Sequence, residues 1–275
     1  METSLATPLT WKHYPAGPKG FFRAPVLLTG PTEALLIDGG FTLSDGHALV
    51  EAIRNTGKRL TTIYVSQSDP DYYFSLRPLQ EAFPEARVIA APETVAAIRA
   101  SVEKKLAAWA PQLGDNGPRT LAEVVIPDPF EGKTLTVDGQ PLEIVDAEGL
   151  VNRRYLWVPA LRAVFGGVLA FSGVHVWTAD TPTREQRALW TATLEKILAR
   201  KPVVVVPGHM TADAATDLSA LEATRAYLAA FEEELARGGD SVALIAAMKA
   251  RYPDLGMEVA LDIGAKVTTG EMKWG

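Results

Sequence analysis

Residues 64–73 read Tyr64-Val65-Ser66-Gln67-Ser68-Asp69-Pro70-Asp71-Tyr72-Tyr73 and place a polar cluster directly after an apolar run. The β-branched run at residues 61–65 predicts a strand. Apolar residues follow at helical spacing at Leu76, Leu79 and Phe83 and predict a helix. The polar residues therefore lie in a loop between a strand and a helix, a position at which loops commonly carry functional side chains.

The succession of strand and helix continues on both sides of this loop. In the first half, strands are predicted at residues 24–28, 34–37, 61–65 and 87–90, and helices from Ser44, from Leu76 and from Pro92 toward Trp109. The turn residues Thr29-Gly30-Pro31-Thr32 separate the first two strands and predict a hairpin.

A second β-rich half follows. Strands are predicted at residues 134–137, 142–145, 154–158, 163–165 and 202–206, and helices at 183–200, 218–236 and 242–251. Because many strands are joined by short hairpin turns, such as that at residues 137–140, the pattern favours an α+β fold, a four-layer αββα sandwich, over a doubly wound sheet. We expect one domain over residues 1–275, with a surface excursion or lid at 110–133.

Four segments resemble motifs of the metallo-β-lactamase superfamily. The turn Ile37-Asp38-Gly39-Gly40 resembles its Leu-Ile-Asp-Thr-Gly turn, and Val206-Pro207-Gly208-His209 resembles its late Pro-Gly-His strand end. Residues 165–180 are similar to its F-x-G-D-x-x-F-x-G-x-H segment, and the loop at 64–73 takes the place of its His-x-His-x-Asp-His loop. The resemblance covers residues 28–209 and implies the αββα fold, with Asp38 in a turn that supports the metal loop.

The resemblance also implies that the metal-binding loop has lost its histidines. When Asp71 is aligned with the motif aspartate, Gln67 and Asp69 fall at the first two histidine positions and Tyr72 falls at the third. Restoring histidines at these three positions, together with an aspartate at residue 168, is expected to recover zinc binding if the backbone geometry persists.

Two further ligand positions differ from the family pattern. The metal-bridging aspartate falls on Val168, and the remaining histidine falls on Gly149, with Glu148 one residue away. We expect Gly149 to adopt a positive φ angle that would strain a histidine. His209 is retained, so Asp71 and His209 are the two expected ligands that remain.

The surviving donors suit at most one metal ion. Asp69, Asp71 and His209 could supply three ligands, whereas a zinc ion is typically held by about four. With Glu148 the set would be rich in oxygen and better suited to Mn²⁺, Mg²⁺ or Ca²⁺. Because Val168 cannot bridge two ions, we expect either no metal or a single divalent ion, and no zinc pair.

Each of these residues also has a structural interpretation. Asp69 and Asp71 could cap the helix that follows Pro70, and two carboxylates this close also make a general-base candidate. A histidine at a strand end, such as His209, is often simply hydrogen-bonded, although its Pro-Gly-His context favours the site. The remaining residues that we expect to line the pocket are Gln67, Tyr72, Glu148, Val168 and His175, the last held by Asp180.

Composition excludes several classes of function. The chain has no cysteine and a formal net charge of -6, so thiolate sites are excluded and nucleic acid is not an expected partner. Residues 1–20 lack the pattern of a signal peptide, and no apolar run is long enough to span a membrane. We expect a cytoplasmic protein that binds a small molecule, while the oligomeric state is left open.

Two functions are compatible with the sequence. The chain is either a divergent hydrolase or a metal-free pseudoenzyme. The hydrolase would act on a small substrate with at most one metal ion, and Asp69, Asp71 and His209 would be its catalytic residues. The pseudoenzyme would use the cleft between the two sheets to bind a small molecule or a partner. Function depends on the site and not on the fold, so the resemblance alone does not choose between them.

Overall fold

The computed structural model describes residues 8–274, so residues 1–7 of the segment tested for a signal peptide, and Gly275, lie outside the described part. Its strands are β1 (Thr10–His13), β2 (Val26–Thr29), β3 (Glu33–Ile37), β4 (Arg59–Val65), β5 (Arg87–Ala90), β6 (Asp128–Pro129), β7 (Thr134–Val137), β8 (Gln140–Asp146), β9 (Arg154–Val158), β10 (Ala163–Phe165), β11 (Phe171–Ser172), β12 (Val204–Val205) and β13 (His209–Met210). Its helices are α1 (Leu43–Thr56), α2 (Leu76–Ala82), α3 (Pro92–Leu113), α4 (Arg184–Ala199), α5 (Ser219–Ala236), α6 (Ser241–Arg251) and α7 (Glu258–Thr268).

The strands form two larger sheets and one short pair. The first sheet has the order β1-β2-β3-β4-β5-β6, and the second has the order β12-β10-β9-β8-β7. The predicted hairpin is confirmed, because β2 and β3 pair antiparallel. Strands β11 and β13 form a separate parallel pair, which carries His209.

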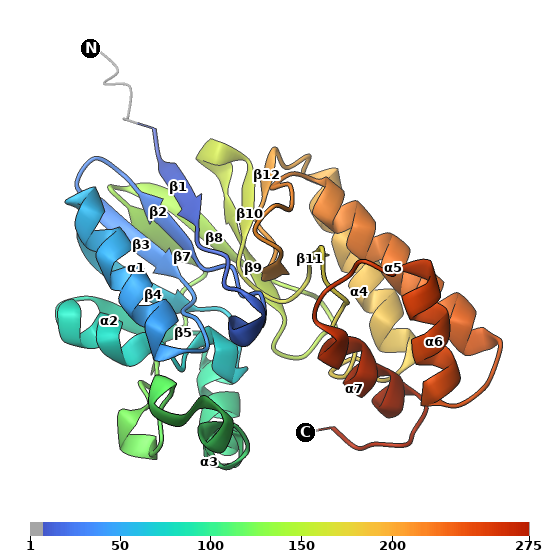
Figure 1. The fold of residues 1–275 in the computed structure, drawn as a ribbon. Coiled ribbons are helices and arrows are strands. Elements are labelled where there is room, and N and C mark those ends of the chain that lie inside the picture. The colour runs from blue at the N-terminus through green and yellow to red at the C-terminus, as the bar shows by residue number, and fades with distance from the viewer. Residues whose placement is uncertain (1–7, 275) are drawn as a thin grey trace.

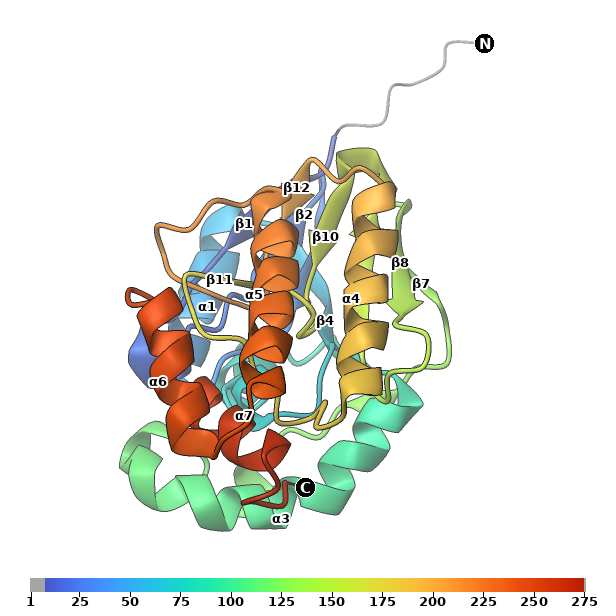
Figure 2. The same ribbon diagram turned by 90° about the vertical axis from the view of Figure 1, so that its right-hand side faces the viewer.

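Helices cover the outer faces of the two sheets. In Figure 1, α1 and α2 lie outside the first sheet, and α4 and α5 lie beyond the second. Figure 2 shows α4 and α5 side by side along that outer face. This arrangement is a four-layer αββα sandwich, as the sequence predicted.

Alternation of apolar residues explains how the layers hold together. In β3, Leu35 and Ile37 belong to the core between the sheets, whereas Ala34 and Leu36 belong to the core shared with the helices. All four residues are fully buried. Burying a leucine or isoleucine side chain stabilises the fold by about 1.5–3 kcal/mol. Strand β3 therefore stabilises both the packing between the sheets and the packing of its sheet against the helices.

The hairpin turn between β7 and β8 ties the two halves of the chain together. Asp138 and Gly139 have positive φ angles of 46° and 76°, which suit a tight two-residue hairpin turn. The Asp138 carboxylate accepts hydrogen bonds from the backbone amides of Thr32 and Glu33 at 3.0 and 2.9 Å, in the turn between β2 and β3.

Several elements differ from the sequence prediction, which did not include β1, β11 or β13. The expected strand at 202–206 is reduced to β12, and part of the expected excursion at 110–133 is the last turn of α3 and the edge strand β6. A proline is tolerated in β6 because the strand lies at the edge of its sheet. Helix α7 was not predicted: Met257 at its N-cap supplies no side-chain hydrogen bond, so the usual start signal is absent.

Among residues 8–274, no helix is long and apolar enough to cross a membrane.

Candidate functional site

The polar loop that follows β4 is fixed from behind by Asp38. The Asp38 carboxylate accepts hydrogen bonds from the backbone amide and the hydroxyl of Ser66, at 2.6 and 2.8 Å. The same hydroxyl accepts a hydrogen bond from the Gly167 amide at 2.8 Å. The expectation that the Asp38 turn supports this loop is thereby confirmed, and the loop is held against the chain segment that follows β10.

The fold brings Asp71 and His209 together at the centre of the site. The Asp71 Oδ2 and His209 Nε2 atoms are 3.5 Å apart, and the two residues are only 7% and 4% exposed. His209 Nδ1 lies 2.7 Å from the backbone oxygen of Phe21. Because a carbonyl oxygen only accepts hydrogen bonds, Nδ1 carries the hydrogen and the Nε2 lone pair points toward Asp71.

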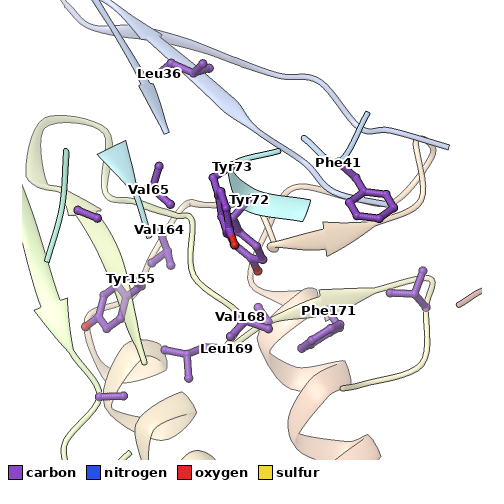
Figure 3. Close-up of a cluster of buried hydrophobic side chains, with 14 of the residues drawn as sticks. Leu36, Phe41, Val65, Tyr72, Tyr73, Tyr155, Val164, Val168, Leu169 and Phe171 are labelled. Atoms are coloured by element: carbon purple, nitrogen blue, oxygen red, sulfur yellow. The ribbon is translucent and has the colours of Figure 1, made fainter. Parts of the chain in front are cut away.

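Aromatic rings enclose the imidazole. The Phe171 ring stacks on His209 with centroids 5.4 Å apart, and the Tyr72 ring meets it edge to face at 5.9 Å. The Tyr72 hydroxyl donates a hydrogen bond to the Gly167 oxygen at 3.0 Å and lies 3.4 Å from His209 Nε2. Figure 3 shows Tyr72, Val168 and Phe171 converging in this buried region.

The site also contains Arg23, which the sequence analysis did not single out. Its side chain is completely buried. The guanidinium donates to the Gly208 oxygen and, at 3.1 Å, to Asp38 Oδ2, and its Cζ atom lies 3.5 Å from the centre of the Tyr72 ring. Its Nε atom is 3.8 Å from Asp71 Oδ2.

Backbone pairing determines where Arg23 points. Arg23 forms an isolated antiparallel bridge with His209, and the flanking bonds join the Ala24 amide to the Gly208 oxygen and the Met210 amide to the Phe22 oxygen. The sequence offered one signal for Arg23, namely a charged residue inside the apolar run Phe21-Phe22-Arg23-Ala24. An arginine that is buried among apolar residues is almost always paired, so this position indicates a buried ion pair. Its charge partner Asp38 is 15 residues away, but its backbone partner His209 is distant in the sequence, and no local pattern links His209 to Arg23.

Burial and the nearby guanidinium set the charges in the site. Burial raises the pKa of Asp71 to about 7, against the opposing attraction of Arg23. Burial and then the positive charge of Arg23 lower the pKa of His209 to about 3. Burial also raises the pKa of Asp38, although Arg23 and the hydrogen bonds from Ser66 oppose that shift. Near pH 6 Asp71 is therefore mostly protonated and the His209 imidazole is neutral, beside the Arg23 guanidinium.

The other predicted loop residues are directed elsewhere. Asp69 forms an ion pair with Lys105 of α3 at 3.1 Å. The Gln67 side-chain oxygen accepts hydrogen bonds from the Ser68 amide at 2.6 Å and the Asn152 side chain at 2.9 Å. Both loop positions thus use their oxygens in contacts within the protein.

Two predicted positions lie in the segments that frame the site. Val168 is 2% exposed, and its backbone oxygen accepts a hydrogen bond from Arg153 at 2.9 Å. Gly149 has the expected positive φ angle, 78°, and a Cβ atom there would lie 3.0 Å from a Leu189 methyl group. A histidine at residue 149 would therefore be both strained and crowded.

Glu148 and His175 are not part of the cluster. The Glu148 side chain is 83% exposed and pairs with Lys196 at 2.7 Å. His175 is buried, but its Nδ1 atom lies 3.0 Å from the Tyr227 hydroxyl. Asp180, which was expected to hold His175, instead contacts Arg153. Neither residue faces Asp71, because Glu148 lies on a surface turn and His175 packs against α5.

The side chains around Asp71 do not fit the zinc site that the fold family implies. The 3.5 Å separation of Asp71 Oδ2 and His209 Nε2 would suit two donors of one ion, but zinc needs about four donors. The other nearest groups are the phenol of Tyr72 and the guanidinium of Arg23, and a guanidinium repels a metal cation. Within residues 8–274, no group of three or more His, Cys, Asp or Glu side chains is placed to hold a metal ion.

Comparison with known proteins agrees with the architecture. Among solved structures, VMB-1 at pH 5.5 is 19% identical with a TM-score of 0.56, over 82% of this chain and 95% of that one. A metallo-beta-lactamase from Pontibacter korlensis is 18% identical with a TM-score of 0.55, over 82% and 97%. DIM-1 exposed to ceftazidime is 16% identical with a TM-score of 0.53, over 82% and 94%. These likenesses establish the fold.

Sequence comparison establishes the family. A search of curated proteins finds no match to this chain. The sequence profile described as "Metallo-beta-lactamase superfamily" matches residues 19–209, which is more than half of the chain and includes both Arg23 and His209. The chain belongs to the metallo-β-lactamase superfamily.

Proposed function

We propose that this protein is a metal-independent, non-hydrolytic member of its superfamily that acts by binding a small molecule at the rim of the former metal site. The observation that carries the proposal is that the donors at the ligand positions are engaged within the protein. Gln67 accepts from Ser68 and Asn152, and Asp69 pairs with Lys105. A donor that is already paired must give up that contact before it can bind a metal, which weakens metal binding.

The centre of the site has no room for a substrate. Arg23, Tyr72 and Phe171 are at most 2% exposed, and Asp71 is 7% exposed. A hydrolase has to bring the reacting bond within about 3–3.5 Å of the group that attacks it. Entry of a substrate would require these side chains to move, so binding is more readily placed at the rim.

The rim consists of five residues, which we call the rim cluster. Four are half-buried and Trp274 is exposed; the half-buried ones are Asp69, Lys105, Trp177 and Asp180. The rings of Trp177 and Trp274 meet edge to face at 5.1 Å, and the Trp274 indole donates to Asp180 at 2.8 Å. The negative charge of Asp69 contributes to the raised pKa of Asp180, which places the two carboxyl groups near each other. Aromatic faces beside charged groups are typical of small-molecule sites.

A hydrolase with one metal ion is the second candidate. It is favoured by the 3.5 Å separation of Asp71 and His209, which matches two donors of a common ion. Hydrolysis by this route would require further metal ligands from water or substrate. The Arg23 side chain would also have to move away from Asp71.

Metal analysis combined with an activity panel tests the proposal. The purified protein would be titrated with Zn²⁺ and Mn²⁺ while thermal unfolding is followed, because an ion at about 100 times its dissociation constant stabilises by about 2.7 kcal/mol. A cephalosporin, an acyl thioester, a lactone and a phosphodiester would be offered with and without each ion. We expect no metal-dependent stabilisation and no hydrolysis. Turnover that requires an added ion and disappears in Asp71→Asn would overturn the proposal in favour of the hydrolase.

The same panel can reveal binding without turnover. Tryptophan fluorescence of the wild type would be compared with that of the double variant Trp177→Phe, Trp274→Phe. A compound that changes the fluorescence of the wild type alone, and that is recovered intact, would place a binding site at the rim cluster.

A further inference from the structure

The buried guanidinium of Arg23 is surrounded by the residues at and beside the retained ligand positions. Its three nitrogen atoms face three different groups: the Gly208 oxygen, Asp38 Oδ2 and Asp71 Oδ2. Its flat face covers the Tyr72 ring, with Cζ 3.5 Å from the ring centre. Gly208 and Asp71 belong to the two family motifs that would otherwise carry the metal, and Tyr72 occupies a third ligand position.

The buried Asp38 carboxylate requires a cation at this place. Asp38 has no exposed surface, and an uncompensated buried carboxylate is strongly unfavourable. In the described part of the chain, Arg23 is the partner of Asp38 in an ion pair. A guanidinium meets this requirement well, because it is planar, remains charged and presents donors in several directions.

We propose that the Arg23 guanidinium is the resident cation of this site: a tethered organic cation that satisfies Asp38 and the Gly208 oxygen and keeps metal ions out of the space between Asp71 and His209. This inference rests on the proposed metal independence and goes further, because it assigns the excluding group and defines a pocket that selects guanidinium. Truncating Arg23 to alanine would then leave a cavity shaped and charged for N-ethylguanidinium, which replaces the deleted atoms.

Chemical rescue tests the assignment. We expect Arg23→Ala to lower the midpoint of thermal unfolding by on the order of 10 °C, because it leaves a buried carboxylate unpaired. Millimolar N-ethylguanidinium should recover part of that loss. N-ethylurea, which has nearly the same shape and no charge, should not. Arg77→Ala is the matched control: Arg77 pairs with Glu81 at the surface, so its removal leaves no cavity and the added cation should have no effect.

A measurement on the wild type keeps the inference testable if Arg23→Ala does not fold. The Nε–H signal of Arg23 in ¹⁵N NMR should exchange slowly with solvent, and added Zn²⁺ should leave it unchanged. Rapid exchange, displacement of this signal by zinc, or equal rescue of a folded Arg23→Ala by the cation and by the urea would overturn the inference. Failure of the proposed function alone looks different, since hydrolysis without any added metal ion could occur while N-ethylguanidinium still rescued the variant and Zn²⁺ left the Nε–H signal unchanged.

Discussion

Asp71 Oδ2 lies 3.5 Å from His209 Nε2, and the fold reverses the protonation that these two groups would have in water. Near pH 5.5 an isolated aspartate is ionised and an isolated histidine is mostly protonated. In the folded protein the pKa of Asp71 is about 7 and that of His209 is about 3, mainly because burial disfavours both charged forms. The proton thus resides on the carboxyl group, and the pair is buried without net charge.

This exchange of the proton predicts opposite pH effects for the two single substitutions. The raised pKa of Asp71 means that the folded state binds more protons than the unfolded state between about pH 4 and 7, so its contribution falls as the pH rises. The lowered pKa of His209 means that the unfolded state binds more protons between about pH 3 and 6.5, so its contribution falls as the pH falls. In the wild type the two contributions largely cancel between pH 4 and 6.5.

Asp71→Asn should therefore lose stability on acidification below pH 6.5, and His209→Gln should lose stability as the pH rises from 4 to 7. Each slope can reach about 1.4 kcal/mol per pH unit, the value for one proton. Urea unfolding of both variants and of the wild type, at intervals from pH 4 to 7.5, measures the slopes. Slopes of the same sign in the two variants would show that the protonation states are assigned wrongly.

The sequence predicted the parts of the fold that depend on local pattern. Alternation of apolar residues located β7, β9 and β10 at their observed bounds, and the turn chemistry of Asp138 and Gly139 located a hairpin. Helix α7 was missed because it lacks a capping side chain and contains Gly264, whose close approach to Thr178 is a tertiary contact. Local rules do not detect a helix that is stabilised mainly by such packing.

Family motifs indicated which residues the fold brings together around Asp71, but not the partners that come from other elements. Asp71 and His209 were placed together by family motifs, and the structure has them in contact. Arg23 was missed because its role depends on a backbone bridge to His209 across most of the chain. The partner of Asp69 likewise comes from another element, Lys105 on α3, which a loop sequence alone cannot specify.

Two neighbouring tyrosines should respond differently to removal of their hydroxyl groups. Tyr72 donates to the Gly167 oxygen, whereas the buried hydroxyl of Tyr73 has no hydrogen-bond partner among residues 8–274. Tyr72→Phe should destabilise the fold by about 1–2 kcal/mol, since it leaves a buried carbonyl unpaired. Tyr73→Phe should be neutral or stabilising, because it removes an unsatisfied polar group. Chemical denaturation of both variants measures the difference, and a larger loss for Tyr73→Phe would contradict the hydrogen-bond assignment.

Gly208 should tolerate no side chain, because the backbone oxygen of Gly167 and the Arg23 guanidinium approach it closely. An added Cβ atom would lie 2.1 Å from that oxygen and 3.1 Å from Arg23 Nη1. Gly208→Ala should cost roughly 3 kcal/mol or more, since the backbone must shift to relieve the overlap. Gly17→Ala is the control, because Gly17 has a φ of -77° and no atom of the described residues lies within 4 Å of the added methyl. Equal unfolding midpoints for the two variants would refute the predicted crowding at Gly208.

Restoring the ligand side chains should recover zinc binding only when Arg23 is removed as well. The four replacements are Gln67→His, Asp69→His, Tyr72→His and Val168→Asp. With Arg23 in place, we expect this variant to bind zinc weakly or not at all, because the guanidinium lies 3.8 Å from Asp71 and repels the ion. Adding Arg23→Ala should raise zinc affinity by at least about tenfold, which corresponds to 1.4 kcal/mol.

Isothermal titration of the four-site and five-site variants with Zn²⁺ measures this difference, and Arg77→Ala in the four-site background controls for the loss of a positive charge. Gly149 is left unchanged, because its φ of 78° and the nearby Leu189 would strain a histidine there. Replacing Gln67 and Asp69 also removes the contacts that hold the loop to Asn152 and Lys105. Both variants should therefore be less stable than the wild type. Tight zinc binding by the folded four-site variant with Arg23 intact would contradict the exclusion of metal by the guanidinium. No binding by a folded five-site variant would instead mean that the backbone of the loop has moved away from the geometry that a metal requires.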